Sequence, residues 1–154
     1  MKEFLLKMIP IKTTDRFPFR CRQCGACCRK VRESVPLESL DVFRLAKFFR
    51  DSGAKIWSID DVLAEYAEPV LLHKSGYLTF MLKTVGEDSA CIFLKDNRCT
   101  IHDVNPRACR TYPISSIIPA TASDCFSFIW QPNVCTHAYN GLPISFCLLY
   151  TSDA

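Results

Sequence analysis

The chain has no long apolar run and no strong charge of either sign. No stretch of its 154 residues approaches the length of a membrane-spanning helix, and Glu3, Lys7 and Pro10 interrupt the apolar segment that a secretory signal needs. Nineteen basic residues against sixteen acidic ones give a formal charge of +3, which is too small to indicate a nucleic-acid partner. We therefore expect a cytoplasmic protein that partners neither a membrane nor a nucleic acid.

Glycine is also scarce. Only five glycines are present, and no G-x-G-x-x-G follows a predicted strand, so no nucleotide- or adenosylmethionine-binding fold is visible. The C-x3-C-x2-C of radical adenosylmethionine enzymes is missing as well: Cys24 and Cys28 begin it, but Val31 stands where the last cysteine belongs. These absences weigh against an enzyme, and the sequence leaves the question open.

Cysteine, by contrast, is abundant. There are ten, and four of them fall within "CRQCGACC", residues 21 to 28. Crowded thiolates repel and crowded thiols oxidise, so a metal ion, an iron–sulfur cluster or disulfides must join them. Thiols stay reduced in the cytoplasm, where clustered cysteines bind metal more often than they form disulfides. The sequence therefore favours metal.

The spacing within this first block supports the same reading. Cys21, Cys24 and Cys27 follow C-x2-C-x2-C, and Gly25 suits a turn with positive φ that points backbone N–H groups at sulfur. The block is not that of a bacterial ferredoxin, whose fourth cysteine comes later and precedes proline. Side chains of adjacent residues diverge, so we expect Cys27 or Cys28 to face a second ion, a neighbouring cluster atom or the core.

A second block comprises Cys91, Cys99 and Cys109. A hairpin is predicted near 91–102, with Asp96 and Asn97 at its tip, and it brings the first two of these cysteines close to its ends. A short helix is predicted with Asn105 as its N-cap and Pro106 as its first residue, ended by Pro113, and it carries the third. We expect sulfurs of the two blocks to lie side by side.

Three further polar residues accompany the second block. His102 is a candidate imidazole ligand, although a histidine that only surrounds the site is the favoured interpretation. Arg107 and Arg110 flank Cys109 and are candidate cofactor-binding residues that offset thiolate charge or hold a substrate carboxylate. The alternative for both arginines is an ordinary solvated helix face.

The remaining elements predict a small α+β domain. Residues 1–20 look like a loose lead-in to the first cysteine block. Helices are predicted near 37–52 and 59–68; the second begins with Ser58 three residues before Asp61 and ends at Pro69. The expected apolar stripe of the first consists of Leu37, Leu40, Phe43, Ala46 and Phe49. "GYLTFMLKTVG" predicts a strand.

The C-terminal part of the sequence differs in composition. From Ile114 onward only Asp124 and Asp153 are charged. The ending "CLLYTSDA" resembles translated sequencing-adapter read-through, and the alternative is a genuine apolar tail packed on the core. We therefore set residues 141–154 apart from the rest of the chain.

At this point the motifs identify a resemblance. "CRQCGACC" followed by "CIFLKDNRCTIHDVNPRACRTYP" resembles the CxxCxxCC cysteine-cluster family, called YkgJ-like, of zinc- or iron-chelating proteins, which is mostly bacterial and archaeal. The resemblance implies metal ligands at Cys21, Cys24, Cys27, Cys28, Cys91, Cys99 and Cys109, with Cys135 as the best candidate for a further cysteine that follows the "YP" segment. It also implies a chelating domain over residues 15–140.

The resemblance leaves the function open between classes. The first hypothesis is a metal-binding protein whose zinc, iron or iron–sulfur cluster is structural. The family includes proteins similar to flagellin lysine N-methylase, which implies the alternative of a lysine N-methyltransferase that depends on an iron–sulfur centre and acts on a protein substrate. Electron transfer through an exposed cluster is the third hypothesis.

Overall fold

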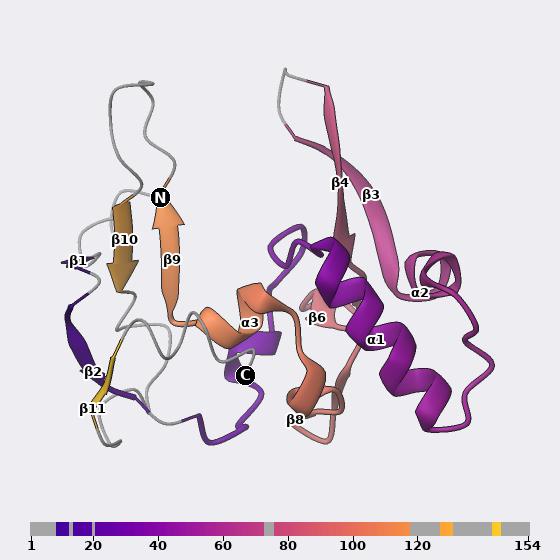
Figure 1. Ribbon diagram of the computed structural model, residues 1–154, viewed down its shortest axis with the longest axis horizontal. Coiled ribbons are helices and arrows are strands. Elements are labelled where there is room, and N and C mark those ends of the chain that lie inside the picture. The colour runs from indigo at the N-terminus through magenta and orange to yellow at the C-terminus, as the bar shows by residue number, and fades with distance from the viewer. Residues whose placement is uncertain are drawn as a thin grey trace. The chain divides into compact units, whose positions relative to one another are not determined.

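The computed structural model describes residues 9–12, 14–19, 21–72, 76–117, 127–130 and 143–145. The chain divides into two compact units: one combines residues 1–22 with 110–154, and the other is the continuous segment Gln23–Cys109. Short helices and small antiparallel strand pairs make up the described parts (Figure 1), so the predicted α+β class is confirmed. Within these ranges no helix has the length and apolarity needed to cross a membrane.

The unit formed by the two ends of the chain is built from short strands. They are β1 (Ile9–Ile11), β2 (Arg16–Pro18), β9 (Ile114–Ile117), β10 (Ser127–Trp130) and β11 (Pro143–Ser145). Strand β10 lies between β1 and β9, and β11 pairs with β2. Phe19, Ile114 and Trp130 are buried together, with the rings of Phe19 and Trp130 edge to face at 6.3 Å. The expected loose lead-in was therefore wrong: it contributes two strands whose partners lie far along the chain.

The unit Gln23–Cys109 carries the helices. They are α1 (Ser39–Asp51), α2 (Ile59–Tyr66), the beginning of α3 (Arg107–Thr111) and the 3-10 turns η2 (Ala26–Cys28) and η4 (His102–Val104). The helices predicted near 37–52 and 59–68 are confirmed. Ser58 starts α2 as predicted, because its Oγ accepts the N–H of Asp61 and the Asp61 carboxylate accepts the N–H of Ser58.

Three antiparallel strand pairs complete this unit. They are β3 (Ala67–Leu72) with β4 (Tyr77–Leu82), β5 (Thr84–Val85) with β6 (Ala90–Cys91), and β7 (Leu94–Lys95) with β8 (Arg98–Cys99). Asp96 and Asn97 form the predicted tip, with φ of 49° and 60°, as a tight hairpin turn requires. The hairpin is shorter than expected, because Cys91 pairs with Thr84 instead of joining the pairing that contains Cys99.

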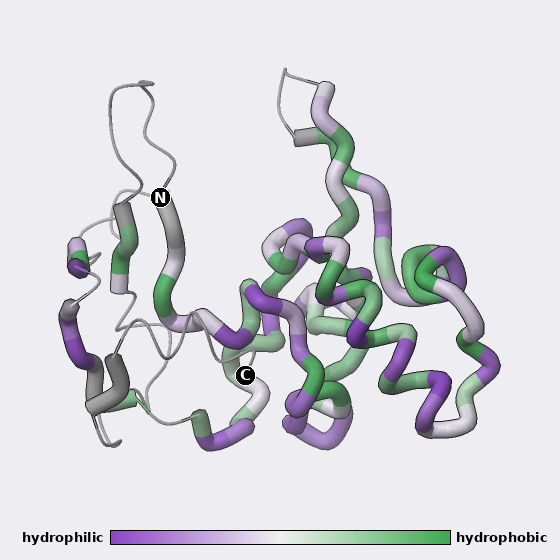
Figure 2. Tube along the Cα trace, viewed as in Figure 1, coloured by the Kyte–Doolittle hydropathy of each residue, from purple (hydrophilic) through white to green (hydrophobic). Residues whose placement is uncertain are grey.

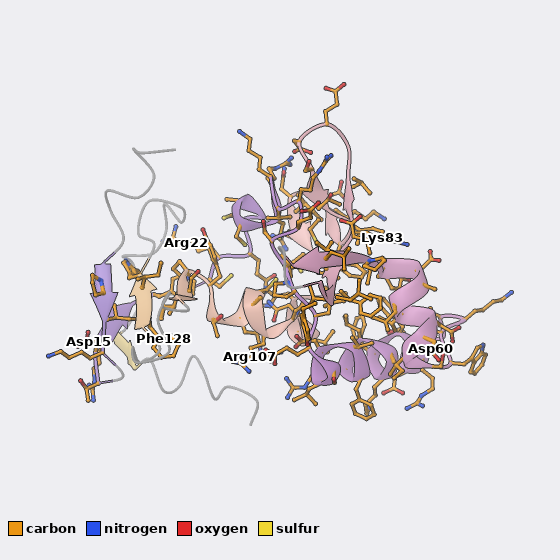
Figure 3. All side chains as sticks on the ribbon, turned by 90° about the horizontal axis from the view of Figure 1, so that it is seen from above. Asp15, Arg22, Asp60, Lys83, Arg107 and Phe128 are labelled. Carbon is orange, nitrogen blue, oxygen red and sulfur yellow. The ribbon has the colours of Figure 1, made fainter. Side chains whose placement is uncertain are left out.

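Helix α2 ends earlier than the prediction placed it, and not at Pro69. The helix stops at Tyr66 and the chain becomes extended at once, so that Pro69 lies inside β3 opposite Phe80. Proline is tolerated there because β4 is the only strand that pairs with β3 among the described residues. Lys83, labelled in Figure 3, replaces the missing helical turn by donating to the carbonyl oxygens of Ala64 and Glu65.

The buried face of α1 is rotated from the expected stripe. Leu40 and Phe43 are 49% and 56% exposed, whereas Val42 and Leu45 are buried, so that part of the prediction was wrong. The carboxylate of Asp41, which is also buried, accounts for the rotation, because its hydrogen bonds fix that side of the helix inward. Figure 2 shows the hydrophilic and hydrophobic residues interleaved along α1.

One apolar core fills the unit Gln23–Cys109. It contains Val35, Leu37, Val42, Leu45, Ile56, Val62, Ala67, Leu82, Cys91, Phe93 and Ile101. Tyr66 stacks on Phe49 with ring centroids 4.7 Å apart and contacts Phe93 at 4.9 Å. Cys28, Cys99 and Cys109 pack against the same residues. The core therefore extends up to the cysteines of both sequence blocks.

Candidate metal centre

Five cysteines from four separate elements converge within the unit Gln23–Cys109. The sulfurs of Cys27 and Cys28, both in η2, are 4.0 Å apart, and Cys28 hydrogen-bonds to Cys99 of β8. Cys91 of β6 is close enough to Cys99 and Cys27 to interact with them electrostatically, and Cys109 of α3 interacts with all three. We call these five residues the cysteine cluster.

The separation within η2 is close to what a metal site demands. Four sulfurs around zinc at about 2.3 Å each lie about 3.8 Å from one another. Adjacent cysteines were expected to diverge, yet the tight 3-10 turn brings Cys27 and Cys28 within 4.0 Å. The two sequence blocks meet at Cys28 and Cys99. The expected approach of Cys21, Cys24 or Cys27 to within about 4 Å of a sulfur of the second block stays a prediction.

Cys28 occupies the middle of a chain of sulfurs. It is hydrogen-bonded to both Cys27 and Cys99, and these two contacts, together with burial, raise the pKa of Cys28. The same two hydrogen bonds stabilise the acceptor thiolates: they lower the pKa of Cys27 to about 7 and that of Cys99 to about 6. Cys27 and Cys99 therefore lose their protons more readily than an ordinary cysteine, and thiolate is the form that binds metal.

The two other members of the cluster are held in apolar surroundings. Burial is the main cause that raises the pKa of Cys91 and of Cys109, and the neighbouring sulfurs add to the effect. Cys91 is 6% exposed and belongs to the core. Cys109 is half-buried, whereas Cys27 is exposed.

Gly25 makes the close approach of the two blocks sterically feasible. It has φ of 70°, as predicted, and precedes η2, whose first hydrogen bond runs from the Cys28 N–H to the Gly25 carbonyl at 3.0 Å. A Cβ on Gly25 would lie 2.5 Å from the backbone oxygen of Asn97 and 2.7 Å from Leu94 Cδ1. The first block therefore rests directly on the hairpin β7–β8 that carries Cys99.

Arg29 ties the first block to the second on the other side of η2. Its guanidinium donates to the carboxylate of Asp88 at 2.6 Å and to the side-chain oxygen of Asn97 at 2.7 Å. The backbone adds two bonds, from Lys30 N–H to the Asp88 carbonyl (2.9 Å) and from Val31 N–H to the Ser89 carbonyl (3.0 Å). Sequence reasoning missed Arg29, because nothing local distinguishes it from the other basic residues nearby.

His102 lies beside the cluster and is bound by the first block. Its Nδ1 is 3.2 Å from Nε2 of Gln23, and its proximity is one of the smaller causes that lower the pKa of Cys99. This position agrees with a residue that surrounds the sulfurs. Whether His102 is itself a ligand stays a prediction.

Of the two arginines that flank Cys109, Arg107 has partners that the structure identifies. The guanidinium of Arg107, labelled in Figure 3, donates to the carboxylate of Glu38 at 3.0 Å, and the Arg107 N–H donates to Asp41 at 2.9 Å. Arg110 lies in the last turn of α3. A role of either guanidinium toward a cofactor or substrate stays a prediction.

Three further candidate ligands, Cys21, Cys24 and Cys135, stay predictions. Cys24 is exposed, Cys21 belongs to the unit formed by the chain ends, and Cys135 lies outside the described residues. Among the described residues, no three His, Cys, Asp or Glu side chains are arranged so that they could hold a metal ion. The donor chemistry nevertheless fits zinc or iron, since five sulfurs gather and two of them are favoured as thiolates.

Comparison with known proteins agrees with this chemistry. Residues 20–136 match the model of the CxxCxxCC family, described as a "putative zinc- or iron-chelating domain". Searches among curated proteins and among solved structures found no match. Because the family match covers more than half of the chain and includes every cysteine of the cluster, this protein belongs to the CxxCxxCC family.

Proposed function

We propose that this protein binds zinc or iron through the cysteine cluster and that the metal mainly stabilises the fold. The observation that carries the proposal is the contact of Cys28 with Cys99, with Cys27, Cys91 and Cys109 around it. Apolar burial alone does not explain the grouping, because Cys27 is exposed. Ligands to a shared ion do explain it.

A bound zinc or iron ion would supply a cation that the cysteine thiolates bind in place of their protons. The ligands would come from Cys27, Cys28, Cys91, Cys99 and Cys109, of which Cys27 is exposed and Cys91 is buried. Cys21, Cys24 and Cys135 are proposed as additional ligands on the strength of the family motif alone. Eight sulfurs suffice for two four-coordinate sites or for one cluster with additional ligands.

Magnitudes favour a structural role. Metal binding at a structural zinc site is worth about 10–16 kcal/mol, comparable to the whole stability of a domain at about 5–15 kcal/mol. Three members of the cluster also pack against the apolar core and a fourth belongs to it. Metal and core therefore stabilise the same part of the chain. No contact among the described residues specifically favours the methyltransferase alternative.

The deciding experiment is elemental analysis combined with a visible absorption spectrum. The protein is purified reduced, without oxygen and without chelator. We expect at least one zinc or iron per chain. Colourless protein with stoichiometric zinc identifies a zinc site, whereas brown protein containing iron and acid-labile sulfide identifies an iron–sulfur cluster. Protein that contains neither metal, and that takes up neither on titration, contradicts the proposal.

A further inference from the structure

Asp41 is the one buried charged side chain among the described residues for which burial is resolved. It is 2% exposed and lies in the first turn of α1, next to the core residues Val42 and Leu45. A buried carboxylate is strongly unfavourable unless hydrogen bonds compensate for the water it has lost. Its position therefore calls for partners that use both of its oxygens.

Those partners come from two different helices. Asp41 Oδ2 accepts the backbone N–H of Glu38 at 3.1 Å, which closes the capping box of α1. Asp41 Oδ1 accepts the backbone N–H of Arg107, the first residue of α3, at 2.9 Å. The Arg107 guanidinium returns to Glu38 at 3.0 Å. One carboxylate thus joins the beginnings of α1 and α3, which are 66 residues apart.

The second hydrogen bond acts close to the sulfurs. Cys109 lies two residues after Arg107 in α3, and its N–H donates to the Pro106 carbonyl at 2.8 Å in the first turn. Asp41 is also near enough to Cys109 to interact with it electrostatically. Because α3 is a single short turn, fixing its first N–H fixes the direction in which the Cys109 side chain leaves the helix.

We propose that Asp41 is the positioning residue that holds Cys109 in the cysteine cluster, by bonding the start of α3 to the rigid helix α1. The inference depends on the proposed metal-binding function, and it assigns no ligand role to Asp41 itself. It requires a carboxylate, because an amide at this position has one acceptor oxygen and would set its NH2 group against one of the two N–H donors.

Helix α2 provides a matched control. Asp61 closes the capping box of α2 just as Asp41 closes that of α1, but α2 carries no cysteine. Asp41→Asn and Asp61→Asn both weaken a helix start, and only Asp41→Asn disturbs a residue of the cluster. The two variants separate a general loss of helix stability from a specific effect on Cys109.

The test is titration of metal-free protein with Co2+, followed by the sulfur-to-cobalt charge-transfer absorption and by competition with a chelating dye. For Asp41→Asn we expect about 10–100-fold weaker cobalt affinity and reduced charge-transfer intensity, as is usual when a group that orients a ligand is lost. Asp61→Asn should match the wild type. In metal-free protein, peptide mapping should show faster alkylation of Cys109 in Asp41→Asn than in Asp61→Asn.

Two further variants keep the test decisive if Asp41→Asn fails to fold. Arg107→Pro removes the N–H that Asp41 accepts while remaining compatible with the first position of a helix, and Arg107→Ala removes the side chain but keeps the N–H. We expect Arg107→Pro to weaken cobalt binding more than Arg107→Ala does, because only the proline variant loses the N–H that Asp41 accepts. Cys109→Ser combined with Asp41→Asn should bind no more weakly than Cys109→Ser alone.

The outcomes distinguish this inference from the proposed function. The positioning role is overturned if the wild type binds metal and Asp41→Asn binds cobalt as tightly as Asp61→Asn does, with unchanged alkylation of Cys109. Equal cobalt affinities of Arg107→Pro and Arg107→Ala overturn it as well. In both cases the proposed metal site stands. An additive loss in the double variant also overturns it. If the wild type binds no cobalt, zinc or iron, the proposed function itself fails and this inference with it.

Discussion

The guanidinium of Arg29 donates a 2.7 Å hydrogen bond to the side-chain oxygen of Asn97, which stands 68 positions further along the chain. The same guanidinium binds Asp88, so one side chain spans the residues on both sides of Cys91. Arg29 itself follows Cys28 directly. The two cysteine blocks are therefore held together by protein contacts as well as by any metal.

The first prediction concerns this contact. Arg29→Ala should lower the free energy of unfolding of metal-free protein by about 1 kcal/mol or less, because the ion pair is nearly half exposed. Cobalt affinity should fall too, since the two blocks lose a link beside Cys28. Lys47→Ala, which removes the exposed Lys47–Asp51 pair on α1, is the control and should leave cobalt affinity unchanged. Urea unfolding and cobalt titration measure the two effects; equal cobalt affinities in both variants would contradict the prediction.

The second prediction concerns Gly25. Gly25→Ala should be destabilised by more than Gly53→Ala, although both glycines have positive φ. Alanine at Gly53 meets nothing within 4 Å, so only backbone strain of about 1 kcal/mol applies. Alanine at Gly25 meets the Asn97 backbone and Leu94, which adds about 1–3 kcal/mol. Urea unfolding of the metal-free variants measures the difference, and similar losses for both would refute the close approach.

The third prediction concerns the ligands. Cys28→Ser and Cys99→Ser should each abolish tight zinc or iron binding, because these two sulfurs join the blocks. Cys21→Ser and Cys24→Ser should lower metal content and solubility together if the family motif assigns them correctly. Cys147→Ser, outside the motif, is the control and should change neither property. Equal metal content in all five variants, measured by elemental analysis, would mean that the ligands are misassigned.

The fourth prediction concerns removal of the metal. Protein in free metal at about 100 times the Kd is stabilised by about 2.7 kcal/mol relative to metal-free protein. Chelation under reducing conditions should therefore lower the thermal unfolding midpoint by roughly 10 °C. Restoring zinc or iron should restore the midpoint. Circular dichroism follows both transitions. Coinciding curves with and without chelator would show that the metal does not support the fold.

The fifth prediction concerns pH. The N–H groups of Trp57 and Ser58 donate to the Asp61 carboxylate and lower its pKa. A carboxyl group whose pKa is lower in the folded than in the unfolded protein stabilises the fold at pH values above its unfolded pKa of about 3.9. This stabilisation is lost as the pH falls through the folded pKa. Asp61→Asn should therefore have a lower thermal midpoint than wild type at pH 7, and the difference should shrink below about pH 4. Asp60→Asn serves as the control, and a constant difference across pH would contradict the assignment.

Structural features that depend only on neighbouring residues were predictable from the sequence. The capping box of Ser58 and Asp61, the turn at Asp96 and Asn97 and the positive φ of Gly25 each depend on a few consecutive residues. The meeting of the two cysteine blocks was predictable because shared metal chemistry links residues that are distant in sequence.

Features that depend on distant partners were not predictable. Leu40 and Phe43 look like core residues of α1 until the buried Asp41 turns another face inward. Asp41 itself resembles any acidic residue in a first helical turn, and its contact with Arg107 comes from 66 positions away. Pro69 looks like the end of a helix, but the strand that accommodates it is defined by pairing with β4.

The backbone bonds from Lys30 to Asp88 and from Val31 to Ser89 bring together the two ends of the segment that contains α1, α2 and the hairpin β3–β4. This segment is therefore an insertion between the two cysteine blocks, and its two ends are hydrogen-bonded to each other. Lengthening such an insert has an entropic cost that grows only logarithmically. Residues inserted into this segment should therefore be tolerated, because the bonds between Lys30 and Asp88 and between Val31 and Ser89 keep its two ends together.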